Sequence, residues 1–212
     1  MATAKELFYE KRGQLLVKNL KSRHFDACYC PDKVSALEKA LEWIAEGTTV
    51  GWGGTLTAQQ SGLLDAIRQG NYKCIDRNSA KTPEEKKQAE YDCITCDTFI
   101  TSANAVSLDG QMVNIDGIGN RLAAIAFGPK NVLVVIGMNK VEDTLDAAVN
   151  RARTIAAPQN QQRFDHNTPC KVTGMCSGCK SLDSICNEIL ITRLCKPAER
   201  IRFIVIGEDL GL

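Results

Sequence analysis

Short apolar segments alternate with amphipathic helical segments along most of this chain, and this alternation constrains the fold more than any other feature. Predicted strands lie at residues 24–30, 48–51, 72–76, 97–101, 131–137 and 201–206, of which those at 48–51, 97–101 and 131–137 are predicted to be buried. Predicted helices lie at 4–20, 31–47, 56–68, 82–91 and 142–155. Strands that alternate with helices in this way form parallel sheets, because the crossover helices cover both faces. The sequence therefore predicts an α/β fold with an open, mainly parallel sheet and helices on both faces, in one domain over residues 1–212.

Charge and hydropathy exclude several classes of partner. With 26 basic and 25 acidic side chains the net charge is +1, which gives no basic surface for a nucleic-acid backbone. The longest candidate apolar run, residues 132–138, is far too short to cross a bilayer. Residues 1–20 carry Glu6, Lys11 and Arg12 at intervals, unlike a secretory signal. We therefore expect a cytoplasmic protein that binds neither nucleic acid nor membrane.

A glycine-rich loop, VGWGGTLT at residues 50–57, follows the second predicted strand. Ligands of parallel α/β sheets bind beyond the carboxyl ends of the strands, where glycines let backbone N–H groups and a helix N-terminus face an anion. The pattern matches neither the P-loop nor the dinucleotide fingerprint. A tight turn without a ligand, with Thr57 as the helix cap, is the alternative. The loop predicts ligand contacts from five residues: Gly51, Gly53, Gly54, Thr55 and Thr57.

Small, amide and carboxylate residues fill the segment after the predicted strand at 97–101. Residues 105–116 alternate apolar and polar side chains around Asp109 and Gly110, which predicts an inserted β-hairpin. Asp116 is the candidate catalytic acid or base, and Arg121 can hold a carboxylate or phosphate. The alternative for Asp116 is a cap of the helix that contains Arg121. We expect the second wall of the ligand cleft to include Asn114, Asp116, Gly119, Asn120 and Arg121.

A cysteine-rich segment occupies residues 158–195. Four of the ten cysteines, Cys170, Cys176, Cys179 and Cys186, lie within 17 positions of a polar stretch. In a reducing compartment such spacing is typical of metal ligands, and four thiolates suit either a zinc ion or an iron–sulfur cluster. Buried structural thiols are the alternative. The pair Cys93 and Cys96 lies near the end of a predicted helix and has no thioredoxin-like context.

Residues 108–121 (LDGQMVNIDGIGNR), 127–130 (FGPK) and 134–140 (VVIGMNK) resemble the lactate-utilisation family, the LUD domain, and the likeness extends to the closing RIRFIVIGE at 200–208. The resemblance implies a fold similar to the ribose-5-phosphate isomerase, glucosamine-6-phosphate deaminase and CoA-transferase group. In that group ligands lie between a glycine loop and a later Asp/Gly/Asn segment. The resemblance to the LUD domain also implies iron–sulfur or flavin partner subunits. For the four cysteines it favours a [4Fe–4S] cluster over a zinc ion.

Three functions follow as hypotheses. The first is a LUD-type protein that binds a small anionic metabolite, such as a 2-hydroxy or 2-oxo acid, and passes electrons through a cysteine-bound iron–sulfur centre as part of an oxidoreductase system. The second is a sugar-phosphate or CoA-ester isomerase or transferase with Asp116 as acid or base. The third is an accessory subunit with a structural zinc. A homodimer is compatible with all three.

Overall fold

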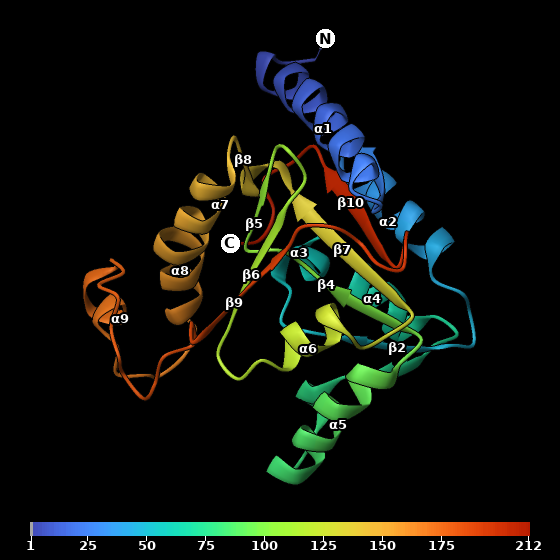
Figure 1. Cartoon of the computed structure of the whole chain (residues 1–212). Helices are drawn as coiled ribbons and strands as arrows, with labels where there is room; N and C mark the ends of the chain where they lie inside the picture. The colour runs from blue at the N-terminus through green and yellow to red at the C-terminus, as the bar shows by residue number, and fades with distance from the viewer. Residues whose placement is uncertain (1) are drawn as a thin grey trace.

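Six parallel strands form the central sheet of the computed structural model, which describes residues 2–212 (Figure 1). Every pairing in this sheet is parallel, as the alternation of strands and helices predicts. The strands, in sheet order, are β1 (Asp26–Cys30), β10 (Ile201–Ile206), β7 (Asn131–Gly137), β4 (Thr98–Thr101), β2 (Thr49–Trp52) and β3 (Lys73–Ile75).

Helices cover both faces of this sheet, and each face has its own apolar core. One core includes residues of α1 (Ala4–Ser22), α5 (Pro83–Thr95) and α6 (Asn120–Ala126). The other includes residues of α2 (Lys33–Trp43), α3 (Leu56–Gln60) and α4 (Leu63–Gln69). Alternate residues of β7 point into the two cores, as expected for a strand buried on both sides. The predicted fold class is confirmed.

A second sheet of four strands packs beside the first. Its strands, in order, are β8 (Val141–Glu142), β5 (Ala105–Ser107), β6 (Met112–Asp116) and β9 (Glu188–Thr192). Strands β5 and β6 pair antiparallel around Asp109 and Gly110, so the predicted hairpin is present. One face of the second sheet carries α7 (Leu145–Arg151), and Val106 and Met112 join the core beneath α1. Strand β9 is the apolar run before Cys195, for which the sequence is compatible with either a helix or a strand; it pairs antiparallel with β6.

Three predicted helices differ from the structure. The helix expected at 56–68 is two helices, because Gly62 adopts a left-handed conformation (φ 78°) between α3 and α4. The helix expected at 142–155 begins at Leu145 and continues through a π-helical turn (Ala152–Ala156) into α8 (Ala157–Gln161). In α1 the helical spacing predicts one apolar stripe of Leu7, Leu15, Leu16 and Leu20; Leu16 and Leu20 are buried, whereas Leu7 and Leu15 are exposed.

The cysteine-rich segment contains one short helix, α9 (Pro169–Thr173), and lies to one side of the second sheet (Figure 1). Two 3-10 turns complete the elements, at Arg77–Ser79 and Met138–Lys140. None of the helices in residues 2–212 combines the length and the apolar character that crossing a bilayer would need.

Candidate functional site

A cavity of about 510 Å³ opens at the carboxyl ends of β2, β4 and β7, and we call it the central cavity. Gly54 and Thr55 reach it from the loop after β2, Ser102 and Asn104 from the loop after β4, and Lys140 from the turn after β7. Strand β2 leads to helices on one face of the sheet and β4 to elements on the other. The cavity therefore occupies the switch point at which parallel α/β sheets bind ligands.

The two walls predicted from the sequence meet in this cavity. The position that a Cβ of Gly53 would occupy lies 3.2 Å from Cδ of Arg121, so the glycine loop packs directly on the Arg121 side chain. Five of the predicted site residues line the cavity: Gly54, Thr55, Asp116, Asn120 and Arg121.

The other five predicted ligand-binding residues do not line the cavity. A Cβ at Gly51 would lie 2.8 Å from Cys93 Sγ, which places this glycine against the end of α5. Gly119 begins α6 in a left-handed conformation beside Glu188. Asn114 is fully buried and donates from Nδ2 to the carbonyl of Ser102 (2.9 Å). Gly53 packs on the side chain of Arg121, and the hydroxyl of Thr57 accepts a hydrogen bond from Lys140 Nζ.

The first turn of α3 is capped by Thr55, whose Oγ1 accepts a hydrogen bond from the N–H of Ala58 (3.2 Å). Thr57, the cap in the alternative interpretation, lies inside the helix instead. Because α3 has only five residues, its dipole contributes little to anion binding. An anion in the central cavity must depend mainly on side-chain cations.

Lys140 is the most unusual cation in the cavity. It is 4% exposed, and its Nζ donates to Thr57 Oγ1 and Ser102 Oγ, both at 3.0 Å. Among residues 2–212 no carboxylate forms an ion pair with it. Burial, the largest cause, and the nearby charges of Arg151 and Arg121 together lower the pKa of Lys140 to about 7. A buried ammonium of this kind lacks a counterion, and an anionic ligand would supply one.

Asp116 and Arg121 form one hydrogen-bonded unit. The carboxylate of Asp116 accepts from the N–H of Gly117 and the N–H of Arg121, both at 3.0 Å, so it caps the start of α6. The guanidinium of Arg121 donates to Asn104 Oδ1 (3.0 Å) and to the carbonyl of Ile115, and its Nε lies 4.0 Å from Asp116. The capping alternative for Asp116 is therefore present in the structure, and its acid–base role stays a prediction.

Basic side chains outnumber acidic ones around the cavity. Arg77, Lys86 and Arg163 line it together with Arg121 and Lys140, whereas Asp116 and Asp183 are the acidic lining residues. Arg77 pairs with Glu90 (3.3 Å), which lies outside the lining. This excess of positive charge in a partly enclosed space favours an anionic ligand.

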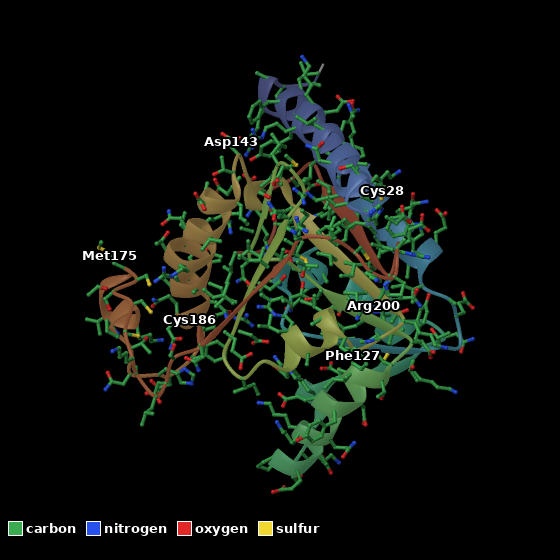
Figure 2. The ribbon with its side chains drawn as sticks, viewed as in Figure 1. Cys28, Phe127, Asp143, Met175, Cys186 and Arg200 are labelled. Atoms are coloured by element: carbon green, nitrogen blue, oxygen red, sulfur yellow. The ribbon has the colours of Figure 1, made fainter. Side chains whose placement is uncertain are left out.

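The four predicted metal-ligating cysteines lie around a second cavity of about 210 Å³, the cysteine cavity. Cys170, Cys176 and Cys179 are half-buried, and Cys186 is exposed. Figure 2 labels Cys186 between this segment and the second sheet, and Met175 at the outer edge of the segment. All ten cysteines are free thiols. The fold thus brings together four thiols that are separated by up to 16 positions in the sequence.

The donor set of the cysteine cavity suits a thiolate-bound metal centre, since no carboxylate lines it. Two of the thiols contact local hydroxyls: Cys170 Sγ lies 3.5 Å from Thr168 Oγ1, and Cys186 Sγ lies 3.3 Å from Ser184 Oγ. Within residues 2–212 no group of three or more His, Cys, Asp or Glu side chains is already arranged around one point as metal ligands. The thiols share a cavity but must converge to bind a metal.

Sequence reasoning assigned no role to Lys140, although it lies in one of the segments that resemble the LUD domain. The signal that could have identified it is its position three residues beyond the end of β7. This is the same carboxyl-end rule that selected the glycine loop.

Comparisons with known proteins agree with this architecture. The profile of the LUD domain family matches residues 13–206. A DUF162-family protein from Deinococcus radiodurans has a similar structure, with a TM-score of 0.57 and 9% sequence identity over 94% of this chain and 98% of that one. Ribose 5-phosphate isomerase A from Neisseria gonorrhoeae is similar over 53% of this chain and 54% of its own, with a TM-score of 0.34 and 19% identity. No curated protein sequence matches the chain.

The family match covers nearly the whole chain, including the glycine loop, the hairpin, Lys140 and the four clustered cysteines. This chain belongs to the LUD domain family.

Proposed function

We propose that the chain binds a small anionic metabolite in the central cavity, with a 2-hydroxy or 2-oxo acid as the class of ligand. The observation that carries this proposal is Lys140, a buried amine bonded to the hydroxyls of Thr57 and Ser102 and without a carboxylate partner among residues 2–212. A bound carboxylate would complete its ion pair, and the 2-oxygen could accept from the hydroxyls or the amides at the same end of the sheet.

The class of ligand is tested by calorimetric titration of the wild-type chain with pyruvate, L-lactate, ribose 5-phosphate and acetyl-CoA. We expect pyruvate or L-lactate to bind and Lys140→Met to weaken that binding at least tenfold, which corresponds to about 1.4 kcal/mol. Lys130→Met is the matched control, because Lys130 lies just before the amino end of β7, away from the central cavity. This variant should bind pyruvate or L-lactate as the wild type does. Preferential binding of the phosphosugar or the CoA ester would support the isomerase or transferase alternative instead.

We also propose that Cys170, Cys176, Cys179 and Cys186 bind a [4Fe–4S] cluster. Four cysteine thiols line one cavity without a carboxylate, and four thiolates suit either a zinc ion or an iron–sulfur cluster. The resemblance to the LUD domain favours the cluster. A bound iron–sulfur cluster would supply one-electron transfer, and the protein would hold it and control its exposure to solvent.

Anaerobic purification followed by iron, sulfide and zinc analysis tests this second proposal. We expect about four iron atoms per chain in the wild type. Cys186→Ser should reduce the iron content, whereas Cys74→Ser, which changes an exposed cysteine outside the cavity, should not. About one zinc per chain and no sulfide would contradict the cluster and favour the accessory-subunit alternative.

A further inference from the structure

The central cavity and the cysteine cavity share a wall. Ile115, Ser184 and Ile185 line both of them. Ile115 belongs to β6, and the other two residues belong to the segment that leads into β9. A change in the cysteine cavity that moves this segment therefore also changes the surface of the central cavity.

The shared wall is tied to the start of the 116–121 turn by three contacts. The N–H of Asn187 donates to the carbonyl of Asp116 (2.9 Å), and Nδ2 of Asn187 donates to the carbonyl of Gly117 (2.9 Å). A Cβ at Gly117 would lie 3.3 Å from Cα of Ile185, so this glycine permits the two backbones to pack closely. Residues 184–187 and the 116–121 turn are therefore positioned as one unit.

Cys186 is the cysteine that belongs to this unit. It lies between Ile185, which lines both cavities, and Asn187, which bonds to Asp116 and Gly117. It is also exposed, unlike the other three cysteines of the cavity. Because its Sγ contacts Ser184 Oγ (3.3 Å), binding of the thiolate to a metal centre would replace that contact and restrain residues 184–187.

The contacts continue from Asp116 to Arg121. The Asp116 carboxylate accepts the N–H of Arg121, and the side chain of Arg121 packs beneath Gly53 of the glycine loop. Restraining residues 184–187 therefore also restrains the 116–121 turn, which positions the Arg121 guanidinium in the central cavity. A restrained site loses less conformational entropy when a ligand binds.

We propose that metal loading of the cysteine cavity through Cys186 tightens anion binding in the central cavity, by restraining the 184–187 segment and the 116–121 turn together. This inference rests on the proposed anion site and on the proposed cysteine centre. By thermodynamic linkage the effect is reciprocal, so a bound anion also increases the affinity of the cysteine cavity for the metal.

The first test measures the coupling without any ligand. Hydrogen–deuterium exchange is followed by mass spectrometry in the metal-free chain, in the chain reconstituted anaerobically with iron and sulfide, and in the chain loaded with Zn²⁺. We expect loading to slow amide exchange in residues 116–121 by at least about fivefold, the lower end of typical coupling between sites. Unchanged exchange in these residues, or no metal uptake in either arm, overturns the proposal.

The second test measures pyruvate affinity by calorimetry in the loaded and metal-free chains. We expect at least about fivefold tighter binding in the loaded wild type. Asn187→Ala, which keeps all four cysteines and removes only the side-chain bond to Gly117, should retain the metal and reduce this difference. Asn131→Ala removes a comparable side-chain bond to a backbone carbonyl (to Asp97, 3.1 Å) away from both cavities and should preserve the difference.

The two tests separate failure of the inference from failure of the proposed function. Equal pyruvate affinity in the loaded and metal-free chains overturns the coupling and leaves the anion site intact. Absence of pyruvate binding in both chains contradicts the proposed ligand class, and slowed exchange in residues 116–121 then still supports the coupling between the two cavities.

Discussion

At the scale of single residues, Lys140 is the group on which the proposed anion site depends. Its amine is enclosed at the carboxyl end of the sheet, and its two partners are hydroxyl groups. Burial lowers the pKa of Lys140 to about 7, so the charged and neutral forms are both populated near neutral pH. A bound carboxylate favours the charged form and raises this pKa. Ligand binding is therefore linked to protonation.

This linkage predicts proton uptake when an anion binds. Above pH 7 the free amine is mostly neutral, whereas the amine in the complex is protonated, so pyruvate binding at pH 8 should take up part of a proton. Affinity should fall by up to about tenfold per pH unit above 7, until the pKa of the complex is reached. Calorimetry in buffers of different ionisation enthalpy measures the uptake. Lys140→Met should abolish it; equal uptake in that variant would contradict this assignment.

At the scale of elements, α7 holds together the loops that form the cavity. Arg151, on this helix, donates from Nε to the carbonyl of Asn139 (2.9 Å) and from a terminal nitrogen to the carbonyl of Asn104 (2.6 Å). The first carbonyl belongs to the turn after β7 and the second to the loop after β4. One buried guanidinium thus links the second sheet's helix to two loops of the central sheet, and its charge helps to lower the pKa of Lys140.

Arg151→Met should have two measurable effects. Two backbone carbonyls lose a charged donor, which should reduce the free energy of unfolding by about 3 kcal/mol in denaturant titrations. Removal of the positive charge should also raise the pKa of Lys140, as measured by NMR of its ε-methylene group. Arg151→Lys keeps the charge and should leave that pKa close to the wild-type value. An unchanged Lys140 pKa in Arg151→Met would show that the charge of Arg151 does not lower it.

The elements also show what sequence patterns can predict. Most strands of the central sheet were predictable because they are short, mainly apolar runs bounded by turn residues, whereas the edge strand β3 is largely exposed. The break between α3 and α4 was not, since one glycine inside a helical pattern is often tolerated. The pairing of β9 was not predictable because its partner β6 lies about 75 positions earlier, and its exposed Ile189 and Ile191 follow a polar, cysteine-rich stretch. Its pairing is a long-range property that no local pattern contains.

The candidate site was predictable where it follows a strand end. Gly54, Thr55 and the 116–121 turn follow strands of the two sheets, so chain order alone placed them near one another. The packing roles of Gly51 and Gly119 depend on Cys93 and Glu188, which are distant in sequence. Lys140 became recognisable only when the structure put its amine next to Thr57 and Ser102.

At the scale of the whole molecule, two groups among the ten cysteines differ in their chemistry. Cys93 and Cys96 are buried beside Gly51, and burial raises their pKa values to about 11 and about 12. Thiols with such values react slowly, because the thiolate is the nucleophile. The four cysteines of the cysteine cavity are at least partly accessible.

Iodoacetamide labelling should distinguish these groups. In the metal-free chain at pH 7.5 we expect exposed Cys186 and Cys74 to be alkylated first, and Cys93 and Cys96 to stay unmodified until the chain unfolds. Metal loading should protect Cys186 and leave Cys74 reactive, as read by peptide mass spectrometry. Early modification of Cys93 or Cys96 in the folded chain would contradict their enclosed environment.

The burial of β7 on both faces has a consequence for how this strand is aligned along its axis. Val134 faces one core and Val135 the other, so sliding the strand by one residue would exchange its two faces without exposing an apolar side chain. Hydrophobicity alone therefore cannot set the alignment. Gly137 can, because a Cβ there would lie 2.6 Å from the backbone of Glu208 and Leu210. Sliding Ile136 into that position is sterically blocked, and the block also fixes how far Lys140 reaches beyond the sheet.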